Sequence, residues 1–488
     1  MSDPQRSART PHTGLFAGLL VLLATAGCQS APPGAVSAQD PREGVQPPPV
    51  WSQDGGAAPL APAYWEAFGS PTLDALVSEG LAASPSLASA SLRVVRAAAF
   101  LDIAEGQQLP TVNASLDAAR SRLNFVGLPF GGGGVQTSTT NNFGLAVNVA
   151  WELDLWGRLA AAERAAVGDL EATALDAIGA ELSLAGQIAK AAVTLAELDA
   201  SVELAEQAVE LAERIEANER RLLENGTGQA VSTLSAAARV ADGRATLSAL
   251  QSGADAAETA LATLLGRAAG NIDAATREAL RNELLAADLP PAPAAGVPAE
   301  LMARRPDLAA AEARVRAAQA GAESARAALY PQLSLVASAG TSSAELEDLL
   351  DADFRVWSLG ANLVAPLFNG GVLRAREDQA ITDRDLALLA FVESFLQACA
   401  EVDGALKAEA HLTRELQDRH DQRDALLQVE ELLARSQSRG SAASSQVLAA
   451  SAETLVAETR LVALRRALLH NRMDLYLALG GGFTTSTP

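Results

Sequence analysis

Residues 297–339 read VPAELMARRPDLAAAEARVRAAQAGAESARAALYPQLSLVASA and predict an alanine-rich helix that leads into an alternating strand. The same plan stands earlier, where residues 81–119 read LAASPSLASASLRVVRAAAFLDIAEGQQLPTVNASLDAA. The helix-starting prolines, Pro85 and Pro306, are 221 residues apart, and the prolines before the two strands have the same separation. The segments therefore overlay without a gap, and the chain is an internal duplication.

The composition favours one large elongated domain built from small residues. The 488 residues carry a net charge of -22, and only 4% of them are aromatic. Few bulky side chains argue against a conventional core and favour closely packed helices. A chain so acidic cannot neutralise a row of phosphates, which excludes nucleic acid as a partner. The acidic balance indicates a soluble surface or a water-filled space that prefers cations.

No group of residues in the sequence has the types and spacing of a catalytic site or a metal site. The two cysteines, Cys28 and Cys399, imply no disulfide framework, and a lone cysteine in a helical pattern is usually a small buried hydrophobe. The four histidines stand apart from one another and from both cysteines, so no metal site is expected. The glycines at 131–134 lack the strand-loop-helix context of a phosphate-binding loop. We therefore expect neither an enzyme nor a bound cofactor.

The N-terminus predicts export and lipidation. Residues 1–27 have the basic, apolar and small-residue parts of a signal peptide, and the apolar run is too short to span a bilayer. The segment ends Thr25-Ala26-Gly27-Cys28, which resembles a bacterial lipobox with threonine in place of the usual leucine. We expect Cys28 to carry an acyl lipid such as palmitate; the alternative is a plain signal peptide with an incidental cysteine. Gln29 favours the outer membrane, and the Pro- and Gly-rich residues 28–62 predict an extended tether.

Two pairs of segments alternate in the manner of membrane-crossing strands. Each segment has apolar residues on one face and small or polar residues on the other, and each is long enough to cross a membrane when tilted. Open edges are not tolerated in lipid, so a transmembrane sheet requires strands from other copies, and three copies with four strands each would supply about twelve. The alternative is a soluble four-stranded sheet half-covered by helices. The predicted strands lie at about residues 111–125, 139–153, 332–341 and 356–367.

The residues from Arg158 to Glu224 contain no proline and no strong turn signal. They predict one helix that reaches about 100 Å at 1.5 Å per residue. Apolar residues recur along two of its faces, one through Leu195 and the other through Leu204, so the helix should have two neighbours in a ring or sheet of helices. Between these faces runs an acidic stripe, interpreted as a solvated face with a specific cation path as the alternative. The stripe consists of Glu203, Glu206, Glu210 and Glu213.

Glycine turns end the two long helices, and a second helix follows each turn. The first turn lies at Asn225-Gly226-Thr227-Gly228, and the second at Arg439-Gly440-Ser441, 214 residues later. The change from 221 to 214 predicts that the first strand hairpin carries the longer tip, most simply in its loop. The predicted divisions are a first repeat at 63–289, a linker at 290–297, a second repeat at 298–483 and a tail at 484–488.

Five stretches together resemble a known family: Trp65–Asp74, Trp151–Gly157, Pro298–Leu308, Tyr330-Pro331 and Pro366–Gly371. They look like the TolC-like outer-membrane efflux factors, in particular the NodT-type lipoprotein branch that serves resistance-nodulation-division pumps. The likeness covers about Pro49 to Phe483, and its most specific part is Arg304-Arg305-Pro306-Asp307.

The resemblance implies a mainly α-helical, internally duplicated chain that forms a homotrimer. Its strands would build a transmembrane β-barrel of about twelve strands in the outer membrane. This barrel would continue into a long periplasmic barrel of coiled helices. The implied function is passive export of small molecules, with a periplasmic adaptor and an inner-membrane pump as partners and outer-membrane lipid as surroundings.

By the same resemblance, the glycine turns face the adaptor, and the helices after them narrow the entrance. Many members carry Leu-Asp-Ala in the second return helix, where the aspartate helps to close the entrance, but this chain has Leu448-Ala449-Ala450. Closure would then fall to Val447 and Leu448, or to Arg439, although a leucine on a helix is a core residue far more often than a gate. The adaptor-facing residues are Gly226, Thr227, Gly228, Arg439, Gly440 and Ser441.

The sequence thus favours a passive export duct whose energy comes from an inner-membrane partner. Two alternatives stand beside it: the exit duct of a one-step (type I) protein secretion system, which shares the fold, and a non-conducting helical scaffold that spans the periplasm. Lipidation and the Arg-Arg-Pro-Asp segment weigh against the first alternative. Four alternating strands of membrane-crossing length weigh against the second.

Overall fold

The computed structural model describes residues 50–53, 55–56, 63–125, 136–268 and 271–482. The predicted signal peptide, Cys28, most of the tether and the C-terminal tail lie outside these residues. All described residues belong to one unit, Pro47–Pro488. Within the part of the chain that is described, no helix is both long enough and apolar enough to cross a membrane.

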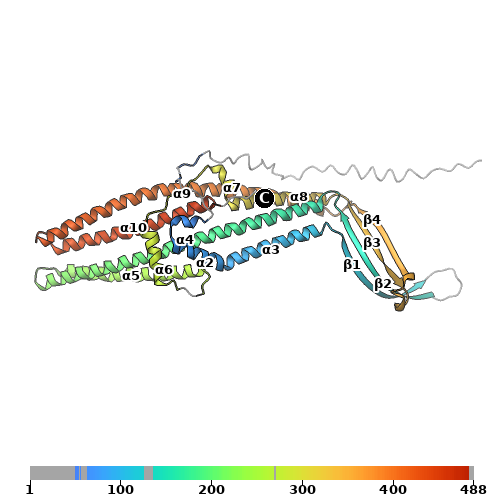
Figure 1. Cartoon of the computed structure of the whole chain (residues 1–488), viewed down its shortest axis with the longest axis horizontal. Helices are drawn as coiled ribbons and strands as arrows, with labels where there is room; N and C mark the ends of the chain where they lie inside the picture. The colour runs from blue at the N-terminus through green and yellow to red at the C-terminus, as the bar shows by residue number, and fades with distance from the viewer. Residues whose placement is uncertain (1–49, 54, 57–62, 126–135, 269–270, 483–488) are drawn as a thin grey trace, which may run out of the picture. The chain divides into compact units, whose positions relative to one another are not determined.

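Two long helical hairpins dominate the structure, one in each repeat (Figure 1). The first helices of the hairpins, α4 (Arg158–Glu224) and α9 (Val372–Ser438), have 67 residues each, which corresponds to about 100 Å. The return helices, α5 (Ala230–Leu264) and α10 (Ser444–Ala478), have 35 residues each. The bounds of α4 coincide with the expected ones, because Gly226 just after it takes a φ of 75° that ends the helix.

Shorter helices precede the strands in each repeat. Pro85 and Pro306 each stand at the first turn of a helix, where a missing N–H and a fixed φ are tolerated. The first set consists of η1 (Tyr64–Phe68), α2 (Pro71–Ala83) and α3 (Pro85–Gly106). The second set consists of η3 (Pro298–Glu300), α7 (Leu301–Arg304) and α8 (Pro306–Ala327).

The return helices end next to the residues at which α3 and α8 begin. Gly266, which follows α5, lies so near α2 that a Cβ there would come within 3.0 Å of the carbonyl oxygen of Ala83. Gly480, which follows α10, is packed still more closely on the carbonyl of Arg304. Both glycines have positive φ values, 73° and 94°, so a side chain at either position would be strained. At Gly480 a side chain would also clash with the backbone of Arg304.

Helix α4 is an inner member of the helical layer. Near the strands it packs between α3 and α8, and beyond its middle it packs between α5 and α10. Helix α9 lies next to α8 and α10. The order is therefore α3-α4-α8-α9 near the strands and α5-α4-α10-α9 beyond the middle of α4. Figure 1 shows the two hairpins side by side, with their tips apart. The prediction that the long helix has a neighbour on each of two faces is confirmed.

The acidic stripe on α4 is a mostly solvated face. Glu203 pairs with Arg281 at 2.5 Å, and Glu213 pairs with Arg244 of α5 at 2.6 Å. Glu206 and Glu210 are exposed. Two of the four charges thus have a guanidinium partner on a neighbouring element, and the other two face water.

A segment that the sequence did not predict as helical crosses the first hairpin after α5. It consists of α6 (Ala274–Leu280) and a short π-helix, η2 (Arg281–Ala286). Arg277 of α6 binds Asp199 of α4 and lies 3.0 Å from Glu258 of α5. On the other side, Arg465 of α10 donates to the Leu284 carbonyl at 3.0 Å. The segment therefore ties the two hairpins together.

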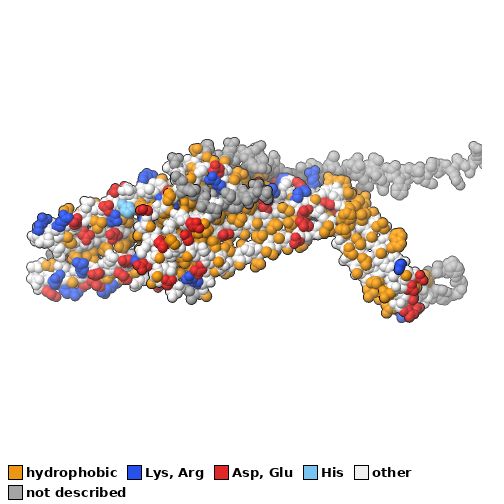
Figure 2. Space-filling model, viewed as in Figure 1, with side chains coloured by type: hydrophobic (Ala, Val, Ile, Leu, Met, Phe, Trp, Pro, Cys, Tyr) orange, Lys and Arg blue, Asp and Glu red, His pale blue; other side chains and the backbone are white. Residues whose placement is uncertain are grey.

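The strands form one antiparallel sheet in the order β1-β2-β3-β4. They are β1 (Thr111–Phe125), β2 (Gln136–Leu153), β3 (Gln332–Ser343) and β4 (Arg355–Val364). Pairing of β2 with β3 joins the two repeats. Hydrophobic side chains gather over the strands in Figure 2, and many large ones are exposed. They include Val112, Leu116, Val147, Trp151, Val336, Trp357, Leu359 and Leu363.

Three details of the strands differ from the prediction. β2 begins at Gln136 and not at residue 139. β4 ends at Val364 and not at residue 367, because Pro366 has no N–H for a ladder and restricts the residue before it. The first hairpin gains its extra length in the strands and not in the loop. β1 and β2 have 15 and 18 residues, against 12 and 10 in β3 and β4, whereas the intervening segments, 126–135 and 344–354, are similar in length.

The largest buried cluster joins the start of the chain to its end. Tyr64 of η1 is fully buried and stacks on Tyr476 of α10 with ring centroids 5.6 Å apart. Phe68 lies 6.0 Å from the same Tyr476 ring. Aromatic rings are scarce in this chain, so this cluster is a concentrated source of burial that holds η1 on the second hairpin.

Candidate functional site: the tip turns and the helix junction

The two glycine turns at the hairpin tips have the same geometry. Gly226 and Gly440 both have a φ of 75°. The Gly226 N–H donates to the Leu223 carbonyl at 3.0 Å, and the Thr227 N–H donates to the Leu222 carbonyl at 3.0 Å. These are the two hydrogen bonds of a Schellman motif, which satisfies the last carbonyls of α4. The second turn repeats both bonds 214 residues later.

Hydroxyl groups reinforce each turn from within. Thr227 Oγ1 donates to the Leu222 carbonyl at 3.2 Å, and Ser441 Oγ donates to the Ser436 carbonyl at 3.0 Å. The Gly228 N–H also reaches the Leu222 carbonyl, at 2.8 Å. The Arg439 side chain is exposed beside the second turn, where its Nε donates to the Arg435 carbonyl at 3.2 Å. The tips therefore present a rigid backbone turn with one nearby cation in the second hairpin.

Replacing Gly226 and Gly440 together with alanine is expected to destabilise the tips. An L-residue with this positive φ costs about 1 to 2 kcal/mol. The change should appear as faster proteolysis at the turns and a lower midpoint of thermal unfolding. Gly321→Ala is the matched control: Gly321 lies inside α8 with open space around its Cα, so alanine should stabilise by about 0.5 to 1 kcal/mol. Equal effects of the two changes would contradict the turn geometry.

The residues predicted to narrow the entrance in the second hairpin differ in their exposure to solvent. Leu448 is 7% exposed and packs inside the protomer, whereas Val447 is half-buried and Ala449 is exposed. Of the two predicted constriction residues, only Val447 keeps surface that could narrow an entrance. The equivalent of Leu448 in the first hairpin, Leu234, is 72% exposed. Sequence reasoning overlooked Leu234, although the 214-residue spacing points to it.

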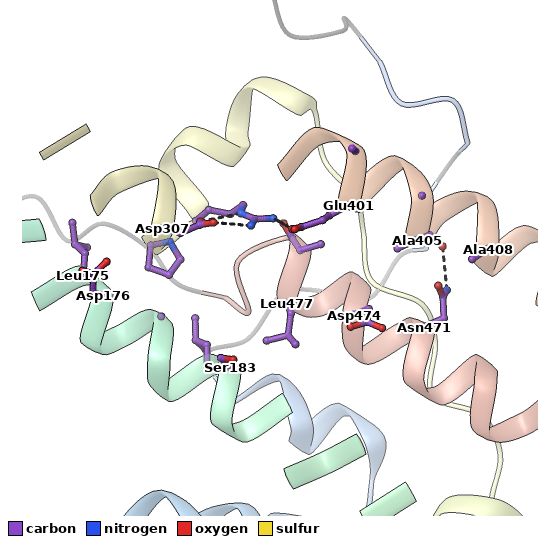
Figure 3. Close-up of a pocket in the computed structure, with 17 residues that line it drawn as sticks. Leu175, Asp176, Ser183, Asp307, Glu401, Ala405, Ala408, Asn471, Asp474 and Leu477 are labelled. Atoms are coloured by element: carbon purple, nitrogen blue, oxygen red, sulfur yellow. Dashed lines mark hydrogen bonds and ion pairs between the residues drawn. The ribbon is translucent and has the colours of Figure 1, made fainter. Parts of the chain in front are cut away.

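A cluster around Arg305 lies where α8 begins and α10 ends. Its members Asp307 and Glu401 are labelled in Figure 3. The Arg305 side chain is only 10% exposed. Its Nε and Nη2 donate to both carboxylate oxygens of Asp307, at 3.0 and 2.7 Å. Its Nη1 donates to Glu401 of α9 at 2.7 Å and to the Ala478 carbonyl at 3.0 Å. One guanidinium thus joins the ends of two helices to a third helix.

The charge of Arg305 governs the ionisation of Asp307. Burial alone would raise the pKa of Asp307, but the hydrogen bonds and the charge of Arg305 outweigh burial and lower it. The backbone N–H of Leu308, at 2.9 Å, acts in the same direction. Asp307 is therefore ionised at neutral pH and serves as the permanent partner of Arg305.

A cavity of about 870 Å³ lies beside this cluster, lined in part by Asp176, Ser183, Asn471 and Asp474 (Figure 3). Its carboxylates are already paired: Asp176 with Arg314, and Asp474 with Lys190. Across the described residues, no group of three or more His, Cys, Asp or Glu side chains could hold a metal ion. The cluster around Arg305 therefore fits a structural junction between helices.

Three comparisons relate the chain to known proteins. The family model "Outer membrane efflux protein" matches residues 76–267 and 297–481. The pyoverdine export outer membrane protein OpmQ of Pseudomonas aeruginosa is 34% identical over 86% of this chain and 87% of its own. The toluene efflux pump outer membrane protein TtgF of Pseudomonas putida is 29% identical over 86% of this chain and 85% of its own. Among solved structures, the outer-membrane channel OprN covers 90% of this chain and 98% of its own, with a TM-score of 0.77 and 26% identity.

Proposed function

This chain belongs to the outer membrane efflux protein family, and we propose that it is the trimeric outer-membrane duct of a tripartite efflux pump. The family assignment, the outer-membrane location and the efflux function agree with the resemblance drawn from the sequence. Relatives are named for export of pyoverdine and toluene, so the proposed cargo is a small organic molecule. The duct is passive: it makes and breaks no bond, and the inner-membrane pump supplies the energy.

The main observation behind the proposal is that the sheet and the helical layer each have two open edges. Within the described residues, β1 and β4 each pair with a strand on one side only. The helical layer likewise ends at α3 and α5 on one side and at α9 on the other. A sheet in lipid must close, because an unpaired backbone group there costs several kcal/mol. Three copies would close both layers, with about twelve strands around the barrel.

The proposed partners attach at the tip turns. The paired Schellman turns at Gly226 and Gly440 are rigid, exposed and duplicated, which suits repeated docking of a periplasmic adaptor. Adaptor contact would then bias the hairpins between packed arrangements and open the entrance. The pump itself, of the resistance-nodulation-division type, would lie beyond the adaptor.

Conductance across a planar lipid bilayer tests the duct. The full-length purified protein should give discrete channel steps, at least in variants whose tips are loosened by Gly226→Ala and Gly440→Ala. A trimer that never conducts under either condition would favour the periplasmic scaffold instead. Accumulation of a small-molecule dye in cells that lack the protein, with protein secretion unchanged, separates the efflux duct from a one-step secretion duct. The opposite pattern would favour the secretion duct.

Replacing Cys28 with serine is expected to abolish acylation, because the sulfur atom of the thiol is the atom that would receive the lipid. Metabolic labelling with a radioactive fatty acid should mark the native protein and not the Cys28→Ser variant. Cys399→Ser is the matched control and should keep the label, since Cys399 lies within α9 and burial raises the pKa of its thiol. If the radioactive fatty acid still labelled the Cys28→Ser variant, the proposed lipidation at Cys28 would be wrong.

A further inference from the structure

The cavity of about 870 Å³ beside Arg305 has both an apolar and a charged lining, and helices of a single copy form it. Small residues of α4 and α9 keep it open, among them Gly179, Gly404 and Ala405. Leu182 and Leu477 line its apolar part, and both pack against the buried aromatic cluster of the chain. Figure 3 shows α4 on one side of this space and α9 with α10 on the other. A cavity of this size with an apolar part fits a drug-sized molecule.

Carboxylates dominate the charged lining of the cavity. Its four carboxylate side chains are between 39% and 54% exposed, and they are Asp176, Asp307, Glu401 and Asp474. Arg305 is the only cation among the described residues of the lining, and Asp307 and Glu401 share it. Arg314 and Lys190, the partners of Asp176 and Asp474, are not among the lining residues. The lining therefore presents four carboxylates against one guanidinium.

The internal duplication indicates that the architecture does not require these charges. The long helices and the return helices have the same lengths in both repeats. The counterpart of every charged lining residue is nevertheless neutral, at a separation of 214 residues in α4, α9 and α10 and of 221 residues in α8. Asp176 and Asp474 correspond to Ala390 and Ala260, Asp307 and Glu401 to Ser86 and Gln187, and Arg305 to Ser84. A set of charges confined to one of two equivalent junctions indicates a role beyond helix formation.

The cavity opens on the bare face of the helical layer. On the covered face, Arg472 of α10 donates to the Pro290 carbonyl of the linker, and Tyr476 stacks on Tyr64 of η1. Asp474 is two residues from both Arg472 and Tyr476, so at 3.6 residues per turn it lies about 160° away from them around α10. A duct must stay open, so η1 and the linker lie outside a closed ring of helices. The cavity then faces the inside of the duct.

We propose that this cavity is a binding site for cargo on the wall of the duct, and that it takes organic cations with an apolar body. This inference rests on the proposed duct and adds the charge class of its cargo. The apolar body contacts Leu182 and Leu477, and the positive charge lies among the carboxylates, near Asp176 and Asp474. Because these carboxylates are partly solvated, binding is weak and reversible, which lets the cargo pass.

The fluorescence of ethidium, an aromatic cation, tests the charged part of the site in the full-length trimer in nonionic detergent. Ethidium should bind, and the anion fluorescein should not. Asp176→Asn with Asp474→Asn should weaken ethidium binding about tenfold, because one partly exposed charge pair contributes up to about fivefold. Glu206→Gln is the matched control, since Glu206 is exposed on α4 and is not among the lining residues. Equal weakening by the two changes would overturn the site, because the net charge of the chain would then explain the binding.

Filling the cavity tests its shape without touching its charges. Gly404 of α9 lines the cavity, and a Cβ at this position would meet no atom within 4 Å. Gly404→Leu should therefore keep the fold and abolish ethidium binding. Gly321→Leu is the control, because Gly321 also has open space but lies about 22 Å along α8 from the cavity residue Pro306. Thermal unfolding followed by circular dichroism reports folding of both variants. A folded Gly404→Leu variant that binds ethidium as tightly as the native protein would rule out this cavity as the site.

Conductance across a planar bilayer separates this inference from the proposed function. A trimer that conducts but does not bind ethidium, or whose ethidium binding ignores both sets of replacements, overturns the cargo site and leaves the duct intact. A trimer that binds ethidium in this cavity but never conducts overturns the duct, and with it the place of the site in export.

Discussion

Replacing Arg305 with alanine is expected to lower the free energy of unfolding by about 3 kcal/mol, the low end for breaking a buried ion pair. The low end applies because Asp307 and Glu401 are partly exposed, with side chains 51% and 39% accessible, and water screens the charges left behind. The change also removes the hydrogen bond to the Ala478 carbonyl at the end of α10. The helix junction should loosen as a result.

The midpoint of thermal unfolding, followed by circular dichroism in detergent, measures this effect. At about 2.1 cal/mol/K of unfolding entropy per residue, 3 kcal/mol corresponds to a fall of about 3 °C in a chain of this length. Arg304→Ala is the neighbouring control. Among the residues that the structure describes, Arg304 pairs only with Glu300, one turn away. Both side chains are more than a third exposed, at 36% and 44%. Its loss should cost about 0.5 kcal/mol or less. If the two alanines behaved alike, Arg305 would not be the junction.

Replacing Ala208 with proline is expected to break α4 in the half of the helix nearer its tip. Proline removes a helical N–H and its ring clashes with the preceding turn, at a cost of about 3 kcal/mol or more. Ala208 is exposed in the protomer, so the cost falls on the backbone and not on side-chain packing. The tip of the first hairpin should become sensitive to protease, and the trimer should dissociate more readily.

Ala230→Pro is the matched control in the same hairpin. Ala230 is the first residue of α5, and Gln229 before it has an extended backbone (φ -115°, ψ 138°) that suits a following proline. Proline at this position should leave proteolysis and trimer stability close to native. An Ala208→Pro variant as stable as Ala230→Pro would contradict the continuous helix.

Local signals were enough to predict the long elements. Helix α4 ends where Asn225 and Gly226 stop it, and β1 and β3 begin after Pro110 and Pro331. Each of these boundaries depends on backbone preferences of one or two residues, which act regardless of the rest of the fold. The duplication strengthened these predictions, because the proline before a strand and the glycine turn after a long helix each appear in both repeats.

The segment with α6 and η2 escaped prediction for the opposite reason. It is short, has no long apolar period, and is held by residues far away in the chain. Arg277 reaches Asp199 and Glu258, and Arg465 reaches the Leu284 carbonyl. A helix of seven residues is marginal by itself and forms because tertiary contacts stabilise it.

The sequence by itself determined the repeat, the bounds of the long helix α4 and the glycine turns at the tips, because these follow from local backbone chemistry and spacing. Only the tertiary structure decided at which equivalent positions of the two repeats the residues have the same burial and the same contacts. Leu448 is buried while its counterpart Leu234 is exposed, and Arg305 joins three helices where its counterpart, Ser84, caps the start of one. Burial and long-range ion pairs depend on which faces of the helices meet, and that is a property of the packed chain.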